Sequence, residues 1–352
     1  MRLNLAMLKW GMHRLWARRS TDIRAVATRQ WVLSPEETAT IPPAIFPNGA
    51  LERVRALSPW RTWEVERTLI DGGRCDHAAS RAYLIEHVEV SGAYIYRAGA
   101  KSRHGFGAER LLLPDSDLRR HFDEVSLVSN YAGSHFFGNF LLDDFPLGLI
   151  PDPGASTIVM ETNDYPHETG YRDLLSLPRP PLIRNANVRR LMVYMDFAQN
   201  SFKAARYNEL RKRMRRNFDG AALPRGPGVY LKRGATGERR IVTNEAELEL
   251  LLAGLGFDII ESEKLAPDEI ARRTLGARLV VSVEGSHLSH AIYTIDDNGS
   301  FLVIQPPERF AMPYKEFADR LGLRFGFVVG KPESDGFAVD LDELQFMLDR
   351  LL

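Results

Sequence analysis

The sequence has very little cysteine: Cys75 is the single thiol in 352 residues. One cysteine excludes a disulfide within the chain and argues against a zinc site built on thiolates. It is also typical of a reducing compartment, so we expect a cytoplasmic protein. Long apolar runs are missing as well. The longest near the N-terminus, residues 5–8, falls far short of the ~20 residues that cross a bilayer.

A surplus of charge is missing too, because 46 Lys and Arg balance 46 Asp and Glu. A general nucleic-acid binder usually has a basic excess, so no nucleic-acid partner is expected. Hydrophobic residues make up 44% and charged residues 26%, which is typical of a soluble globular protein. At roughly 150 residues per domain, the length predicts about two domains.

The neutral total hides a basic N-terminus. Residues 1–19 contain no acid and five cations, which are Arg2, Lys9, Arg14, Arg18 and Arg19. Apolar residues recur there at helical spacing: Leu5, Leu8, Met12, Leu15 and Trp16. This pattern has two interpretations, a helix lying peripherally on an anionic inner membrane surface and a helix packed on its own domain.

The first half predicts a β-rich segment at 60–125, followed by an α/β unit at 125–195. Residues 82–90 and 93–96 flank Ser91-Gly92 as a hairpin, and the proline-rich residues 34–60 predict irregular chain. The α/β unit has predicted helices near 139–149 and 167–175, and predicted strands at 157–161 and 190–194. A basic helix at 203–217 is either solvated or attracts anionic lipid or glycan.

The second half alternates strands and helices more clearly. The predicted strands are 229–232, 257–261, 279–283 and 301–304, and the predicted helices are 244–255, 267–275 and 288–293. A capping box of Asn244 and Glu247 is expected to open the first of these helices. The alternation predicts a parallel, doubly wound sheet. The Pro/Gly run at 223–228 suggests domains at 1–222 and 223–352.

Ligands of open parallel sheets bind beyond the carboxyl ends of the strands, which singles out two loops. Arg233, Arg239 and Arg240 follow the strand at 229–232, and guanidinium groups suit phosphate oxygens. A loop of solvated arginines is the structural alternative.

The second loop follows the most apolar strand and contains Glu284, Gly285, Ser286, His287 and His290. Gly285 permits a tight turn, and the start of the next helix offers N–H groups to an anion. His287 and His290 could form a metal pair, but the sequence offers no third ligand beside them, so no metal is expected.

In the first half, two adjacent carboxylates end an apolar stretch. Asp143 and Asp144 follow His135 and Asn139 at a predicted junction of strand and helix. A carboxylate in apolar surroundings can serve as a general base. Ordinary acids on an exposed helix face are the alternative.

Three stretches together resemble glycosyltransferase family 61, which occurs in bacterial capsular-polysaccharide clusters and among eukaryotic sugar transferases. Residues 139–146 (Asn-Phe-Leu-Leu-Asp-Asp-Phe-Pro) are similar to the family's His-Trp-Leu-Leu-Asp-x-Leu-Pro. Residues 230–233 and 240–245 are similar to Leu-x-Ser-Arg and Arg-x-Ile-x-Asn-Glu. Residues 283–290 are similar to Gly-x-His-Gly-Ala-x-Leu-x-Asn.

The resemblance implies an α/β, GT-B-like enzyme with two Rossmann-like doubly wound domains facing a cleft, preceded by a β-rich portion. It implies metal-independent, inverting transfer of a hexose or pentose from a nucleotide-sugar donor to a glycan or glycolipid acceptor, in surface or capsular polysaccharide biosynthesis. The C-terminal domain would bind the donor and the N-terminal domain the acceptor.

The resemblance also implies roles for the candidate residues. Arg233, with Arg239 or Arg240, would bind the pyrophosphate beside Gly285, Ser286, His287 and His290, and Glu284 would accept hydrogen bonds from sugar or ribose hydroxyls. Asp143 is the first choice as base, with Asp144 and His287 as alternatives, and His135 and Asn139 lie on the acceptor side. Two departures, Asn139 in place of His and the divergent sequence around His290, favour an alternative, a non-catalytic sugar- or nucleotide-binding scaffold of a polysaccharide assembly complex.

Overall fold

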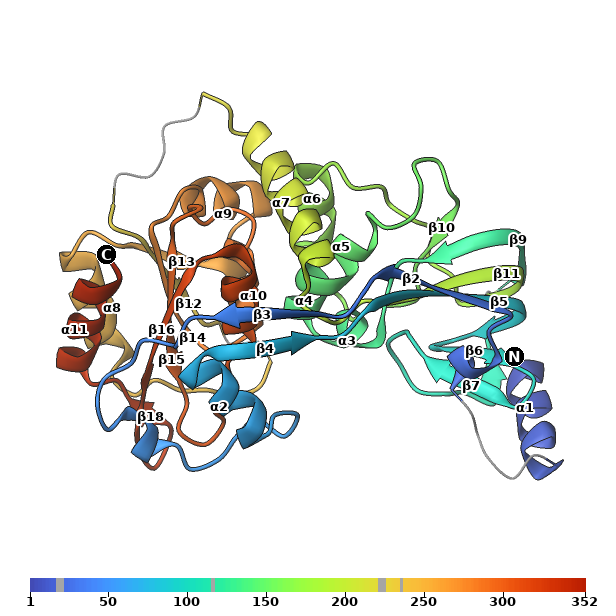
Figure 1. Ribbon diagram of the computed structural model, residues 1–352, viewed down its shortest axis with the longest axis horizontal. Helices are drawn as coiled ribbons and strands as arrows, with labels where there is room; N and C mark the ends of the chain where they lie inside the picture. Colours follow the sequence, from blue (N-terminus) through green and yellow to red (C-terminus); the bar gives the residue numbers. More distant parts are fainter. Residues whose placement is uncertain (17–21, 115–117, 221–225, 235–236) are drawn as a thin grey trace. The chain divides into compact units, whose positions relative to one another are not determined.

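The computed structural model describes residues 1–16, 22–114, 118–220, 226–234 and 237–352 (Figure 1). Its contacts divide the chain into two units. The first comprises residues 1–36, 78–168 and 176–198, and the second comprises 37–77, 169–175 and 199–352. The chain therefore enters each unit more than once. Residues 223–225 of the Pro/Gly run lie outside the described residues.

The first unit is built on a mixed sheet with the strand order β10-β9-β11-β5-β6-β7, and β2 also pairs with β5. Its strands are β2 (Arg29–Ser34), β5 (Ser80–Ser91), β6 (Tyr94–Arg97), β7 (Ala100–Arg103), β9 (Arg120–Leu127), β10 (Thr157–Ile158) and β11 (Asn185–Met195). The predicted hairpin is confirmed, since β5 and β6 pair antiparallel across Gly92.

The expected doubly wound sheet is not what this unit contains. Among its described strands, β9 runs parallel to β10 and β11, whereas β5 pairs antiparallel with β2, β6 and β11. Strands joined by tight turns, such as β5, β6 and β7, can pair only antiparallel. The β-rich N-terminal portion is confirmed, and its sheet is mixed.

Short elements complete the first unit. These are β1 (Arg2–Leu3), which pairs with β8 (Leu112–Leu113), the helices α1 (Leu5–Trp16), α3 (Tyr131–His135), α4 (Phe137–Asn139) and α5 (Phe145–Leu147), a 3-10 turn (Ile23–Val26) and a π-helical turn (Phe140–Asp144). The helix α3 begins after Asn130, whose side chain accepts a hydrogen bond from the Gly133 amide. The helix predicted near 139–149 is confirmed as one continuous helical stretch over residues 137–147, in which the π-helical turn lies between α4 and α5.

The second unit is built on a parallel sheet with the strand order β13-β12-β14-β15-β16. The strands are β12 (Val229–Lys232), β13 (Asp258–Glu261), β14 (Leu279–Val283), β15 (Ser300–Gln305) and β16 (Arg324–Val329). Continuous apolar sequences such as Leu-Val-Val-Ser-Val in β14 suit strands buried on both faces. The parallel sheet predicted from the second half of the sequence is confirmed.

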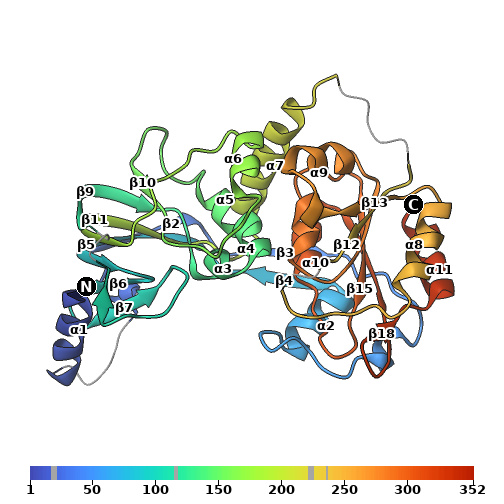
Figure 2. The same cartoon turned by 180° about the vertical axis from the view of Figure 1, so that it is seen from behind.

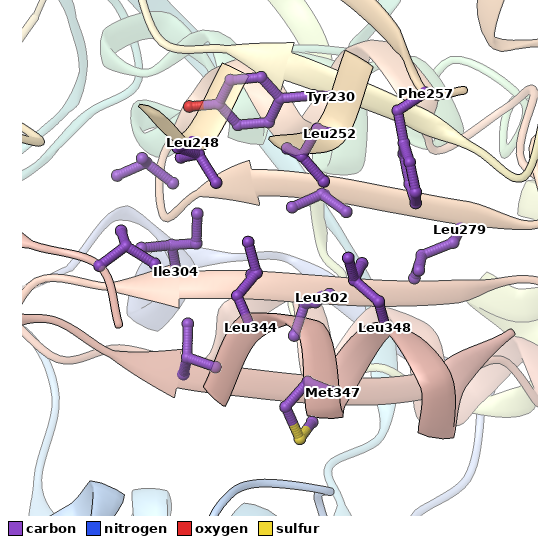
Figure 3. Close-up of a cluster of buried hydrophobic side chains, with 14 of the residues drawn as sticks. Tyr230, Leu248, Leu252, Phe257, Leu279, Leu302, Ile304, Leu344, Met347 and Leu348 are labelled. Atoms are coloured by element: carbon purple, nitrogen blue, oxygen red, sulfur yellow. The ribbon is translucent and has the colours of Figure 1, made fainter. Parts of the chain in front are cut away.

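Helices cover both faces of this parallel sheet. The helical elements of the second unit are α2 (Trp63–Asp71), α6 (Glu168–Leu174, from residue 169), α7 (Ser201–Arg216), α8 (Glu245–Gly254), α9 (Pro267–Thr274), α10 (Pro313–Leu321), α11 (Leu341–Leu351) and short 3-10 turns (Ala50–Arg53, Ser262–Lys264 and Ser286–Ala291). Figure 1 shows α8 and α11 on one side of the strands and α9 and α10 on the other. Leu248 and Leu252 of α8 and Leu344, Met347 and Leu348 of α11 bury one face of the sheet (Figure 3).

Residues 37–77 pack in the second unit, although their first part was predicted to be irregular. Their two ends form the antiparallel strand pair of β3 (Glu37–Ile41) and β4 (Gly73–His77), and the chain that connects these strands contains α2. Ile45 lies along β16, since its amide donates to Phe325 at 3.0 Å and its carbonyl accepts from Phe327 at 2.9 Å. A second small hairpin joins β17 (Lys331–Pro332) and β18 (Phe337–Ala338). The backbone hydrogen bonds between Ile45 and β16 join residues 37–77 to the second unit.

The basic helix α7 is only partly solvated. Lys203, Arg206 and Arg211 are buried. Arg211 donates to the carbonyls of Ile292 at 2.8 Å and Ile295 at 2.6 Å. Part of this positive charge therefore stabilises the second unit by donating hydrogen bonds to main-chain carbonyl groups. In the described part of the chain, no helix is both long and apolar enough to cross a membrane.

Candidate functional site

The strand order of the second unit creates a defined ligand position. Along the sheet the strands follow the sequence order 2-1-3-4-5, so the connections leaving β12 and β14 depart in opposite directions. Ligands of doubly wound sheets bind at this switch point, beyond the carboxyl ends of the strands. Arg233 directly follows β12, and Glu284 directly follows β14. Two residues singled out from the sequence therefore lie at this switch point.

Three arginines surround the buried carboxylate of Glu284. Arg240 Nη1 lies 3.0 Å from Glu284 Oε2, and Arg309 Nη1 lies 3.6 Å from the same oxygen. Arg240 also donates to the main-chain carbonyl of Glu284. Arg233 interacts electrostatically with Glu284, Arg240 and Arg309. We call Arg233, Arg240, Arg309 and Glu284 the arginine cluster.

Arg309 was missed in the sequence. It lies in the loop after β15, the strand next to β14, so its side chain comes from the same edge of the sheet. Its Nε donates to the carboxylate of Glu238 at 2.7 Å. The signal was available, because the strand at 301–304 was predicted and the loop beyond it belongs to the ligand edge by the same rule that selected Arg233.

The arginine cluster carries more positive than negative charge. Burial raises the pKa of Glu284, and Arg240, Arg309 and Arg233 act against this rise. Burial, followed by the charge of Arg240, lowers the pKa of Arg233 to about 10. Burial and Arg309 likewise lower the pKa of Arg240, against the opposing effect of Glu284. Three guanidinium groups thus share one buried carboxylate and the exposed Glu238, so an added anion would be stabilised there.

Gly285 allows the close packing of this cluster. Its φ of +157° is unusual for other residues, and a Cβ at this position would overlap the guanidinium groups of Arg233 and Arg240. The glycine therefore lets the backbone approach both arginines.

His287 is held by a chain of hydrogen bonds. Its Nε2 lies 2.5 Å from Ser282 Oγ, whose hydroxyl donates to the Leu231 carbonyl at 2.5 Å. Its Nδ1 faces Arg233 Nη1 at 3.5 Å. Since the serine proton and the arginine are both committed as donors, Nε2 carries the imidazole proton and Nδ1 accepts. Burial, and then Arg233, hold the pKa of His287 well below its usual range, so the ring is neutral.

The remaining predicted residues of the second unit lie in varied surroundings. Ser286 is half-buried at the start of the 3-10 turn, and Arg239 is exposed. His290 is buried, with Nδ1 2.6 Å from the Tyr171 hydroxyl. Across the described ranges, no three His, Cys, Asp or Glu side chains come together as metal ligands would.

Asp143 and Asp144 of the first unit are both buried, so the alternative of exposed acids on a helix face is wrong. Asp144 Oδ1 accepts from the Asn130 amide at 3.0 Å and from Asn130 Nδ2 at 2.6 Å. Asp143 Oδ2 accepts from Asn139 Nδ2 at 2.8 Å. Asp144 therefore stabilises the turn that begins α3, whereas Asp143 contacts the side chain of Asn139.

Both carboxylates lie on the π-helical turn Phe140–Asp144, where the Phe145 amide donates to the Phe140 carbonyl. Single π-turns inside helical segments are frequent at functional sites, because the extra residue changes the direction of neighbouring side chains. The sequence contained no signal for this turn, whose register also depends on the contact between Asp144 and Asn130.

His135 lies in an aromatic environment in the same unit. Its Nδ1 is 2.9 Å from the Tyr131 carbonyl, and Nε2 is 3.0 Å from Arg103 Nη2. The ring centroid lies 4.2 Å from that of Tyr131 and 5.0 Å from that of Phe106. Partial burial and Arg103 lower the pKa of His135. The rings of Tyr131, Phe106 and Phe136 remain exposed.

The structure thus brings the predicted residues together as two groups. Asp143, Asp144, His135 and Asn139 belong to the first unit. Arg233, Arg240, Glu284, Gly285 and His287 form one group in the second unit, to which the structure adds Arg309.

Comparison with known proteins bears on both groups. Residues 134–300 match the family model Glycosyltransferase 61, which confirms the resemblance inferred from the sequence. The matched range contains His135, Asp143, Arg233, Glu284 and His287, and it ends before Arg309. A comparison with curated proteins gave no match.

Proposed function

This chain carries a glycosyltransferase family 61 domain at residues 134–300 and is therefore a glycosyltransferase, and we propose that its mechanism is inverting. In this proposal a sugar moves from a nucleotide-sugar donor to a glycan or glycolipid acceptor, in the synthesis of a surface or capsular polysaccharide. The observation that carries the proposal is the arginine cluster at the switch point of the parallel sheet.

On the donor side, the arginine cluster binds the diphosphate of the donor. As the bond between the anomeric carbon and the phosphate oxygen breaks, its electron pair leaves with the nucleoside diphosphate. Negative charge then grows on that oxygen, where fixed guanidinium groups stabilise it most. Arg233, Arg240 and Arg309 supply this charge, Glu284 orients Arg240 and Arg309, and Gly285 lets the backbone approach. His287 positions Arg233 through its Nδ1.

On the acceptor side, Asp143 is the proposed general base. It takes the proton of the acceptor hydroxyl while that oxygen bonds to the anomeric carbon, on the face opposite the leaving diphosphate. Asp144 is less suited to this role because its Oδ1 already accepts two hydrogen bonds from Asn130. His287 is less suited because its acceptor nitrogen faces Arg233.

Rings near His135 suit a sugar acceptor. A pyranose has an apolar C–H face that packs on aromatic rings, and its hydroxyl groups need a few polar partners. Tyr131 and Phe136 offer exposed rings, and His135 and Asn139 offer polar groups.

For the whole chain we propose that the first unit binds the acceptor and the second unit binds the donor. The support is the division of residues, with the candidate base in the first unit and the arginine cluster in the second. We also propose a cytoplasmic location, which the single cysteine favours.

Calorimetric titration of the full chain with UDP, GDP, ADP and CDP tests the donor site. At least one of them should bind, and Arg233→Ala should weaken that binding tenfold or more. Arg278→Ala is the matched control, because Arg278 is exposed just before β14, at the opposite end of the strand from Glu284. If none of the nucleotides binds, the proposed donor site is wrong.

A turnover assay separates the enzyme from the scaffold suggested by the departures at Asn139 and around His290. We expect donor hydrolysis or transfer that Asp143→Asn abolishes while nucleotide binding persists. Intact nucleotide binding without turnover in the unaltered chain would favour the scaffold.

A further inference from the structure

We propose that the exposed face of α1, with the neighbouring Leu111 and Leu112, lies in the interfacial layer of an anionic phospholipid membrane and holds the protein at the membrane surface. This inference does not depend on the proposed reaction.

One face of α1 is fixed to the first unit. Ala6 and Trp10 are buried against Tyr96, and Tyr94 packs beside them. Trp10 Nε1 donates to the Gly99 carbonyl at 3.1 Å, and Lys101 Nζ lies 3.7 Å from the center of the Trp10 ring. Figures 1 and 2 both show α1 beside the strands β6 and β7. The helix is therefore anchored to its own unit through this face.

Another face of α1 is apolar and exposed. Large side chains on it have exposed fractions of 50% for Leu5, 38% for Leu8, 57% for Met12 and 85% for Leu15. Spacings of three, four and three residues place them in one stripe along the helix. The two sequence interpretations of residues 1–19 are therefore compatible, because one face packs and another remains available.

The exposed stripe of α1 continues onto the adjoining chain. The Asn4 amide donates to the Leu111 carbonyl at 2.8 Å, and Leu3 pairs with Leu112 between β1 and β8. Leu3, Leu111 and Leu112 are exposed as well. An apolar surface formed by several neighbouring large residues marks an interaction site more often than single exposed residues do.

The charges around this stripe favour anionic lipid as its occupant. Lys9, Arg14 and Arg110 are exposed on or beside α1, and residues 1–19 contain no acid. Lys9 also pairs with Glu89 at 2.7 Å, yet half of its side chain stays accessible to lipid headgroups. A second copy docked through the same face would bring like charges together, whereas an anionic membrane attracts each nearby cation by about 1 kcal/mol.

The geometry fits a helix lying flat in the membrane surface. With 12 residues, α1 is too short to span the bilayer. A surface helix buries its apolar face about 5–10 Å deep, which the stripe on α1 allows while Ala6 and Trp10 keep their contacts.

Vesicle sedimentation with the full chain tests this proposal. Binding to vesicles of phosphatidylcholine and phosphatidylserine should weaken tenfold or more in a triple variant Leu8→Ser, Met12→Ser and Leu15→Ser. The matched control is Leu250→Ser, Leu255→Ser and Phe346→Ser, which removes exposed apolar side chains from the second unit and should leave binding unchanged. Thermal unfolding should be the same in both variants because all six side chains are exposed.

A charge variant and a sedimentation-velocity run complete the test. Lys9→Gln with Arg14→Gln should lower binding to the anionic vesicles severalfold and reduce its salt dependence. Equal binding by the unaltered chain and the α1 triple variant would overturn the proposal. A chain that is dimeric in solution, becomes monomeric in the triple variant and ignores vesicles would overturn it in favour of a second copy.

Discussion

At the residue scale, the main feature is the arginine cluster, whose excess of positive charge favours the binding of an anionic ligand. Arg233 lies near two further arginines, and burial together with Arg240 lowers its pKa to about 10. At neutral pH the side chain of Arg233 stays protonated, so the repulsion between the guanidinium groups persists until an anion binds. Groups arranged this way for function commonly reduce stability.

Replacing Arg233 with Met should therefore separate binding from stability. We expect the free energy of unfolding without ligand to stay the same or rise by about 1 kcal/mol, since a buried charge is replaced by an apolar chain of similar length. Binding of the nucleoside diphosphate should fall at least tenfold. Urea unfolding and calorimetry measure the two effects. A clear loss of stability would mean that Arg233 serves mainly to support the fold.

The adjacent carboxylates should behave differently on substitution. Asp144→Asn should lower the free energy of unfolding by about 1–3 kcal/mol, because the amide cannot accept equally well from both Asn130 donors. Asp143→Asn should abolish transfer. Thermal unfolding and a turnover assay on both variants test this assignment, and the reverse pattern would make Asp144 the base.

His287 should contribute to the pH dependence of stability. The pKa of His287 in the folded chain lies well below its ordinary value of about 6.5. Its contribution to the free energy of unfolding is therefore fully present above pH 6.5 and is lost as the pH falls below this value. Between pH 7.5 and 5.5, His287→Gln should lose less free energy of unfolding than the unaltered chain, with a difference of at most about 1.4 kcal/mol per pH unit. Urea unfolding at both pH values measures this. Parallel losses would show that the folded chain accepts a proton on His287.

At the element scale, local sequence determined the strands of the second unit more closely than the turns of the first. The bounds of β12 and β14 match the prediction, because short apolar runs of this length that contain valine and are closed by charged or glycine residues favour a buried strand. β10 was predicted at 157–161 and is Thr157–Ile158, because Val159 instead forms an isolated bridge with Leu182. The capping box at Asn244 is wrong, since its side chain bonds the backbone of Val339.

Within the turn that holds the carboxylates, Gly133 is the tightest point. A Cβ there would overlap the Asp144 carboxylate, so Gly133→Ala should lower the free energy of unfolding by about 2 kcal/mol. The control is Gly254→Ala in α8, where a Cβ meets nothing within 4 Å and the change should stabilise by about 0.5–1 kcal/mol. Thermal unfolding of both variants checks the pair. An equal gain at Gly133 would show that Asp144 can move away.

At the scale of the whole molecule, the sequence predicted two bodies and the parallel sheet of one of them, but not how the chain divides between them. Residues 37–77 join the second unit through backbone hydrogen bonds to β16 and to Pro307 and Phe310, contacts that no local pattern encodes. Arg309 differs from these residues, because it follows a predicted strand end and the rule for parallel sheets could have found it. Arg233 and Glu284 could be predicted because the rule for parallel sheets needs only the strand ends.

The most direct test of the central claim is a crystal structure of the full chain with a bound nucleoside diphosphate. The account predicts that phosphate oxygens lie within hydrogen-bonding distance of Arg233 and of Arg240 or Arg309, at the carboxyl ends of β12 and β14. A diphosphate bound elsewhere, with the arginine cluster unchanged around Glu284, would contradict it.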